Sequence, residues 1–268
     1  MRPLEPNTRT RLSLAELDGV PLAGAPSSAR VYDAASGETS ASYGPDKRIE
    51  TSACPNLLVV TWDMHGAEVS CEVEVVASHL CTLDDIRSYR GDQYQNAMEH
   101  DDDVFAARER AESTIERAAN RYFLPVMVRA FVDRPNCSTR TQLISDDGSI
   151  LHDVRSIARC ELSDGTVVDV RPVRIGSQFV DVSSIKPGHA ATAYAVCGML
   201  RTPPEARTAA RELAAWFLAE HLEPDNALSV SNEAGVVNFV VSGVNGETPL
   251  PEVNALIKRY ERRDVLIG

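Results

Sequence analysis

Residue types that bind metal ions crowd together at one place in this sequence, His100-Asp101-Asp102-Asp103. A hard cation prefers carboxylate oxygens of this kind. Consecutive side chains at a helix start point in different directions, however, and acidic residues there are stabilised by the helix dipole. The alternatives are a metal site and a solvated helix N-terminus, and we predict the second.

A second acidic stretch, Ser145-Asp146-Asp147-Gly148-Ser149, is superficially similar to a calcium-binding loop. It lacks the alternating acidic spacing and the distal glutamate of such a loop. Asp-Gly is instead a common turn sequence, so we predict a turn. The sequence therefore predicts no metal site.

Motifs that mark the common enzyme classes are missing. The chain has no Gly-x-Ser-x-Gly elbow, no phosphate-binding Gly-x-x-x-x-Gly-Lys and no His-Glu-x-x-His. Six histidines and many Ser and Asp residues could still form a triad assembled in space, which would make the chain a hydrolase. We predict that it is not an enzyme, with no catalytic residue and no cofactor.

The cysteines show no spacing typical of a zinc or redox site. There are six, at Cys54, Cys71, Cys81, Cys137, Cys160 and Cys197. No two form a Cys-x-x-Cys pair, and Cys71 and Cys197 lie in apolar, alternating runs. Free thiols in such runs behave as small hydrophobic groups in a reducing compartment, so we predict core packing.

The charge and the hydropathy of the sequence argue against two classes of protein, those that grip nucleic acid and those that span a membrane. With 27 basic and 39 acidic residues the formal net charge is −12, which argues against a groove that grips nucleic-acid phosphates. An acidic wall along a DNA path fits this charge. No run approaches the roughly 18 apolar residues of a membrane span, and Met1 to Pro6 lack the order of a secretion signal. We expect a soluble globular protein without membrane contact, synthesised in the cytoplasm.

The first part of the chain has the pattern of β-strands. Residues 69–75 place Val, Cys, Val and Val on one face, and Leu57 to Trp62 is typical of a buried central strand. Asp18-Gly19, Ser36-Gly37 and similar pairs predict turns between strands. We predict that residues 1–78 form a small all-β, sandwich-like domain.

Helices are expected next. Thr82 can cap the backbone N–H of Asp85 in a first helix that ends near Gly91. A second helix starts at Asp101, with an apolar stripe of Val104, Ala107, Ala111, Ile115, Ala118 and Tyr122. Its opposite face carries Arg108, Glu109, Glu112, Glu116 and Arg117.

Strands and two further helices complete the pattern. Residues 126–196 alternate and contain Asp-Gly turns, which predicts an antiparallel β insertion. Thr202-Pro203-Pro204-Glu205 predicts a helix capped by Thr202, with Trp216 and Phe217 in the core. After a β-rich stretch at Leu228–Val241, a last helix buries Val253, Leu256, Ile257 and Tyr260. The fold class is therefore α+β, with strands inserted into a helical domain of residues 79–268.

The order of these elements from His79 to Gly268 resembles a known family. The matching segments are Leu83-Asp84-Asp85-Ile86; Ala107 to Ala111 with Asn120-Arg121-Tyr122-Phe123-Leu124-Pro125; Pro203-Pro204 with Ala209 to Ala214; and Pro251 to Ile257. Together they are similar to the head-to-tail connector, or adaptor, proteins in the neck of tailed bacteriophages. The β domain of residues 8–77 departs from the minimal pattern of that family.

The resemblance implies a structural virion protein at the head–tail junction, synthesised in the host bacterial cytoplasm. Such a protein forms a homo-oligomeric, dodecameric ring between the portal and the next neck protein, which is a head-completion or stopper protein. The ring continues the DNA channel, and genomic DNA passes without sequence-specific binding. The alternative from the residues is a non-catalytic binding module whose β domain recognises a carbohydrate or a protein.

The C-terminal residues are the candidate docking segment. Basic side chains are followed by an apolar end: Lys258, Arg259, Arg262, Arg263, Val265, Leu266, Ile267 and Gly268. A solvated helix end that complements the dipole is the other interpretation. The resemblance implies docking on the portal, because the C-terminal segment of these adaptors commonly binds there.

Overall fold

The computed structural model describes residues 10–11, 28–41, 48–49, 55–64, 67–90, 101–218, 229–232, 235–238 and 248–262. These residues form helices and antiparallel sheets, so the predicted α+β class is confirmed. The chain divides into two compact units. We call Met1–Ser78 with Leu124–Leu200 the β unit, and His79–Phe123 with Arg201–Gly268 the helical unit.

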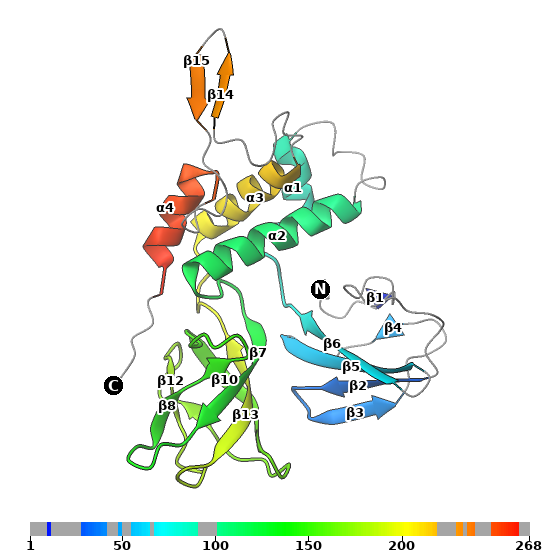
Figure 1. Cartoon of the computed structure of the whole chain (residues 1–268), viewed down its shortest axis with the longest axis vertical. Helices are drawn as coiled ribbons and strands as arrows, with labels where there is room; N and C mark the ends of the chain where they lie inside the picture. The colour runs from blue at the N-terminus through cyan, green and yellow to red at the C-terminus, as the bar shows by residue number, and fades with distance from the viewer. Residues whose placement is uncertain are drawn as a thin grey trace. The chain divides into compact units, whose positions relative to one another are not determined.

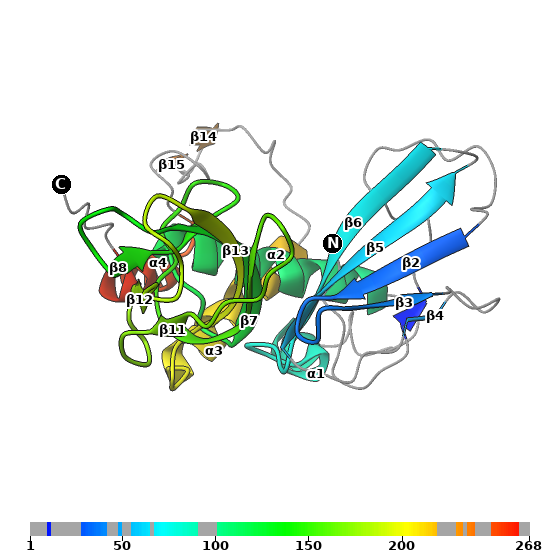
Figure 2. The same ribbon diagram turned by 90° about the horizontal axis from the view of Figure 1, so that it is seen from below.

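The first sheet of the β unit has four antiparallel strands in the order β3-β2-β5-β6. They are β2 (Ser28–Asp33), β3 (Glu38–Ala41), β5 (Asn56–Met64) and β6 (Ala67–Val75), and Figure 2 shows them side by side. A separate pair joins β1 (Thr10–Arg11) to β4 (Arg48–Ile49). The strands predicted at residues 57–62 and 69–75 are confirmed as β5 and β6.

The strands of the second sheet of the β unit lie between α2 (Asp101–Ala119) and α3 (Pro204–Leu218) in the sequence, as predicted. Its order is β10-β13-β7-β9, with β7 at Val126–Asp133, β9 at Ile144–Ser145, β10 at Val154–Leu162 and β13 at Ala190–Cys197. A smaller sheet joins β11 (Arg171–Pro172), β12 (Phe179–Asp181) and β8 (Arg140–Gln142). The predicted turn at Ser145–Ser149 is confirmed, since the Ser149 N–H donates to Asp147 Oδ1 at 2.9 Å.

The two larger sheets share one apolar cluster. Ala34 and Leu57 of the first pack on Met127 and Tyr194 of the second, and each of the four is at most 8% exposed. Beside the cluster, the Arg129 guanidinium lies 3.0 Å from the Glu72 carboxylate and also pairs with Asp146. Burial of the apolar cluster contributes more to stability than these ion pairs, because partly exposed ion pairs contribute little.

The helical unit contains α1 (Leu83–Arg90), α2 (Asp101–Ala119), α3 (Pro204–Leu218) and α4 (Pro251–Tyr260), shown in Figure 1. A strand pair, β14 (Ser229–Asn232) and β15 (Gly235–Asn238), confirms the β-rich stretch before α4. None of the described helices combines the length and the apolar character needed to cross a membrane.

The buried stripes follow the predicted helical spacing in part. Val104, Ala107, Ala111 and Ile115 of α2 are buried, as are Val253, Leu256 and Ile257 of α4. Ala118 and Tyr122, predicted in the first stripe, and Tyr260, predicted in the second, are half-buried.

Glu112, predicted on the opposite face of α2, has a side chain only 14% exposed. The prediction of an exposed Arg108 is wrong, because its side chain is only 2% exposed and its guanidinium lies 4.8 Å from the centre of the Phe105 ring. A cation–π contact lets the long side chain cover apolar surface. Trp216 and Phe217, predicted in the core, are half-buried.

The helix starts show one prediction confirmed and one wrong. The Asp85 N–H donates to Thr82 Oγ1 at 3.1 Å, and the Thr82 N–H donates to Asp85 Oδ2 at 2.9 Å. Thr82 therefore caps α1 as predicted. The helix α3 begins at Pro204, so Thr202 is one residue too early to be its cap. The Thr202 hydroxyl instead donates to the Phe123 carbonyl at 3.0 Å.

A buried glutamate fixes the start of the helical unit. Glu112 of α2 accepts the Leu80 N–H at 2.6 Å through Oε1, and its Oε2 lies 3.0 Å from His79 Nδ1. The side chains of His79 and Glu112 are only 7% and 14% exposed. Satisfying a buried N–H matters here because an unpaired one would cost roughly 1–3 kcal/mol.

Gly198 provides a stability test of the close backbone contact at the end of β13. Its φ is +138°, and a Cβ placed there would lie 2.3 Å from the Leu124 carbonyl oxygen. We expect Gly198→Ala to lower the free energy of unfolding by roughly 3 kcal/mol in urea denaturation. Gly148→Ala is the matched control, because Gly148 also has positive φ but open space around it. Its expected loss is about 1 kcal/mol, and equal losses would contradict a steric cause.

The predicted domain boundary at residue 78 can be tested by truncation. We expect residues 79–268 alone to unfold cooperatively. Their melting temperature should be lower than that of the full chain, because Met127 and Tyr194 lose their contacts with Ala34 and Leu57. Calorimetry checks both points. A truncated chain without a cooperative transition would show that the boundary is misplaced.

Candidate interaction surfaces

The sharp turn at the end of α2 brings three helices of the helical unit together. Asn120 has φ +48°, a left-handed conformation that ends the helix. Phe123 is 0% exposed, and its N–H donates to the Glu116 carboxylate at 2.8 Å. Its carbonyl accepts the Thr202 hydroxyl before α3, and its ring meets the Tyr260 ring of α4 edge-on at 5.8 Å.

The same turn holds the end of α4. The Arg262 N–H donates to the Ala119 carbonyl at 2.9 Å, and Asn120 Nδ2 donates to the Arg262 carbonyl at 3.3 Å. Arg121 Nη1 donates to the Tyr260 carbonyl at 3.2 Å. The backbone is therefore fixed by α2 as far as Arg262, and the C-terminal residues start from a defined point.

The structure places only part of the predicted docking segment. Lys258 and Arg259 are exposed on the last turn of α4, and Arg262 is exposed just after it. The remaining predicted residues lie outside the described residues: Arg263, Val265, Leu266, Ile267 and Gly268. Arg259 Nη1 lies 3.4 Å from Glu205 Oε1, with side chains 68% and 49% exposed, so this ion pair contributes little to stability.

A groove of about 350 Å³ lies between α3 and α4. Its lining residues are Glu205, Thr208, Ala209 and Glu212 of α3, and Glu252, Ala255, Leu256, Arg259 and Tyr260 of α4. The carboxylates outnumber the single guanidinium. The groove therefore suits a ligand with both apolar and basic groups. Sequence analysis missed it because its two sides are some forty residues apart, a separation that local patterns do not reveal.

Three of the described cysteines have thiols that are buried in the core. Burial raises the pKa of Cys81 to about 12, of Cys160 to about 11 and of Cys197 to about 12. Such thiols stay protonated at neutral pH and are poor nucleophiles.

Of the acidic run at the start of α2, Asp102 and Asp103 are exposed, whereas His100 lies outside the described residues. No three metal-ligating side chains gather within the described ranges.

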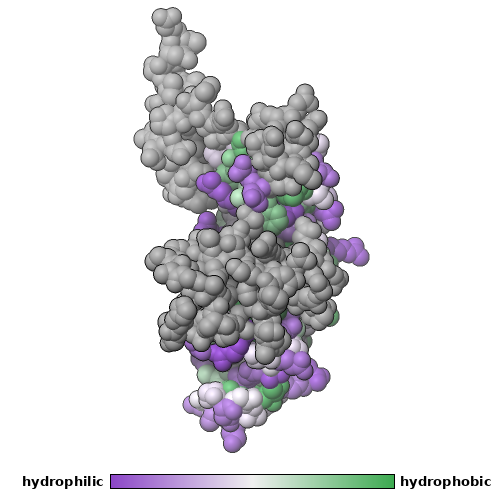
Figure 3. Space-filling model, turned by 90° about the vertical axis from the view of Figure 1, so that its right-hand side faces the viewer, coloured by the Kyte–Doolittle hydropathy of each residue, from purple (hydrophilic) through white to green (hydrophobic). Residues whose placement is uncertain are grey.

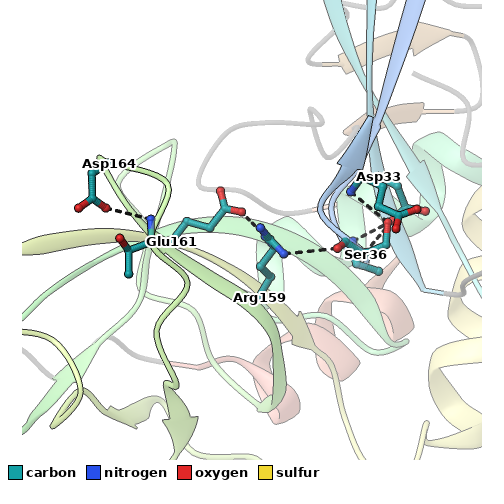
Figure 4. A network of polar contacts seen from close by, with 8 residues as sticks. Asp33, Ser36, Arg159, Glu161 and Asp164 are labelled. Atoms are coloured by element: carbon teal, nitrogen blue, oxygen red, sulfur yellow. Dashed lines mark hydrogen bonds and ion pairs between the residues drawn. The ribbon is translucent and has the colours of Figure 1, made fainter. Parts of the chain in front are cut away.

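A polar network in the β unit is structural in character (Figure 4). Arg159 of β10 pairs with Glu161 and donates to the Ser36 carbonyl at 3.3 Å. Asp33 Oδ1 accepts the N–H groups of Ala35 at 2.9 Å and Ser36 at 3.1 Å, which orders the turn between β2 and β3. The network links this turn to β10.

Large apolar side chains that are exposed include Ile175 and Leu200 as well as Phe131 and Ile144. In Figure 3, the described residues show small hydrophobic areas interspersed with hydrophilic ones. In the β unit, Phe131 of β7 and Ile144 of β9 are cross-strand partners, 49% and 44% exposed. Two exposed side chains form a smaller patch than is usual for an interface.

No protein-family model matches the chain, and a search of curated proteins finds no match. Among solved structures, a chain of "Neck of empty GTA particle computed with C6 symmetry" has a TM-score of 0.45 and 16% identity, covering 69% of this chain and 91% of that one. A chain of "Virion of native gene transfer agent (GTA) particle" has a TM-score of 0.41 and 16% identity, covering 69% and 89%. Likeness at this level assigns neither a function nor a partner to this chain.

Thiol labelling tests the packing role of the cysteines. With a small alkylating agent near neutral pH, we expect fast modification of exposed Cys137 and none of buried Cys81, Cys160 and Cys197 until the chain is unfolded. Mass spectrometry of the digested protein identifies the labelled sites. Rapid labelling of Cys81 or Cys197 in the folded protein would indicate an accessible, reactive thiol and would support an enzymatic role.

Proposed function

We propose that this chain is a non-catalytic structural protein of the neck of a tailed phage or phage-like particle. Copies form a ring between the portal and the next neck protein, and the ring continues the DNA channel. The observation that carries the proposal is the turn after α2. The run Asn120 to Phe123, part of the sequence resemblance to neck adaptors, joins α2 to the start of α3 and the end of α4.

The charge of the chain supports this role. A ring of subunits with a formal net charge of −12 repels the phosphates of passing DNA, so the genome moves without adhering. Cys81, Cys160 and Cys197 are buried, and burial raises the pKa of each thiol, so these three cysteines are poor nucleophiles. The particle neck is thus the proposed location of the mature protein.

The portal contact is proposed for the basic end of α4 and the residues after it. Lys258, Arg259 and Arg262 are exposed, and the chain is fixed to α2 up to Arg262. The proposed segment continues through Arg263 to the apolar residues Val265, Leu266 and Ile267 and ends at Gly268. A specific contact should bury at least about 1,000 Å² in total, so the segment is one part of a wider surface.

Co-sedimentation with purified, portal-bearing, DNA-filled heads tests the function. We expect the intact chain to sediment with the heads, and a chain lacking Asp264 to Gly268 to bind more weakly while keeping its melting temperature. Heads without portal are the control. No binding by the intact chain would contradict the neck role and favour a binding module for a carbohydrate or a protein. Equal binding by both chains would remove the last five residues from the portal contact.

A further inference from the structure

The two ends of the groove between α3 and α4 differ in charge. Arg259, in the last turn of α4, pairs with Glu205, in the first turn of α3, so the end of one helix lies beside the start of the other. The same guanidinium lies 5.4 Å from the centre of the Tyr260 ring. This end of the groove therefore already has a cation of its own.

The other end carries two carboxylates. Glu212 lies about two turns after Glu205 on α3, and Glu252 lies about two turns before Arg259 on α4, roughly 10 Å along each helix. Since both line the same groove, both belong to the end away from the ion pair. Neither carboxylate has an ion pair or hydrogen bond with another residue in the part of the chain that the structure describes.

Small and apolar side chains form the floor between the two ends. Ala209 and Leu256 are buried, whereas Ala255 is exposed to the groove. A lysine or arginine side chain combines an aliphatic stem, which suits this floor, with a charged head, which suits the two carboxylates. Arginine fits better, because its planar guanidinium has enough donors to bond to both carboxylates at once.

A peptide segment suits this groove better than a free small molecule. At about 350 Å³ the groove is near the lower limit of small-ligand pockets, and Glu205, Thr208 and Glu252 on its sides are exposed. A segment held in a groove between helices gains further contacts from the residues beside its anchoring side chain. An aliphatic neighbour of the cation would cover Ala255.

We propose that the groove receives a short segment of the next neck protein, with an arginine side chain at Glu212 and Glu252 and an aliphatic residue on Ala255. Charge complementarity indicates a different protein, because this chain has a formal net charge of −12 and the groove needs a basic partner. The inference rests on the proposed function, which supplies that second neck protein. The proposed portal contact does not use Glu212 or Glu252, so the two contacts are separate.

Fluorescence polarisation with a dye-labelled probe peptide, Leu-Leu-Arg-Leu with blocked ends, measures the contact on the full chain. We expect this peptide to bind and a peptide with Glu in place of Arg not to bind. A peptide with Gly in place of each Leu should bind more weakly. Added salt should weaken binding, because the contact includes exposed charges. Spermidine, a free cation, should not displace the peptide at equal concentration.

Variants that remove one carboxylate locate the binding site. We expect Glu212→Gln and Glu252→Gln each to weaken peptide binding roughly fivefold. Glu261→Gln is the matched control, because Glu261 is an exposed carboxylate of the helical unit that does not line the groove. Its peptide affinity should equal that of the unaltered chain.

A variant that fills the groove gives the sharpest result. The ammonium group of Ala255→Lys should occupy the place of the partner's cation and abolish peptide binding. Ala106→Lys adds the same charge at an exposed alanine outside the groove and should keep it. Thermal melting verifies that each variant is folded. Thr208→Lys, across the groove on α3, replaces Ala255→Lys if that variant unfolds.

Four outcomes overturn the inference. The first is no binding of the arginine peptide at millimolar concentration. The second is equal affinity in Glu212→Gln, Glu252→Gln and Glu261→Gln, which would attribute binding to net charge alone. The third is displacement by an equal concentration of spermidine, which would assign the groove to free amines. The fourth is an Ala255→Lys chain that no longer sediments with portal-bearing heads, which would assign the groove to the portal.

Failure of the proposed function gives a different result. An intact chain that binds the peptide but not the heads would contradict the neck role. It would also remove the neck protein as the source of the segment, while the charge preference of the groove would stand.

Discussion

The turn from Ala119 to Phe123 ends α2, and the rest of the helical unit depends on the bonds that this turn makes to the start of α3 and the end of α4. Asn120 adopts φ +48°, which is less costly for Asn than for most residues with a side chain. This conformation puts Phe123 in a fully buried position, where its backbone groups are paired with Glu116 and Thr202. Because both groups are satisfied, the buried turn carries no unpaired N–H or C=O at Phe123.

Features set by neighbouring residues could be predicted from the sequence. The α1 cap at Thr82, the buried stripes of α2 and α4 and the Asp-Gly turn at Gly148 depend on spacing and backbone preference within one element. Features set by contacts between elements could not. Thr202 bonds to a carbonyl some eighty residues earlier, and Glu112 of α2 accepts the N–H of Leu80, some thirty residues before it.

The same distinction, between features set within one element and features set by contacts between elements, applies to the candidate surfaces. The basic end of α4 is visible in the sequence because Lys258, Arg259 and Arg262 are close together along the chain. The acidic groove is not visible, because its carboxylates are divided between Glu205 and Glu212 of α3 and Glu252 of α4. Only the packing of α4 on α3 brings these charges together.

The central claim is that this chain is a structural component of a particle neck. Cryo-electron microscopy of the particle whose genome encodes the chain tests it most directly. The account predicts density for the helical unit, repeated in a closed ring around the DNA channel at the head–tail junction. Purified, complete particles that lack the chain, or that carry it away from the neck, would contradict the account.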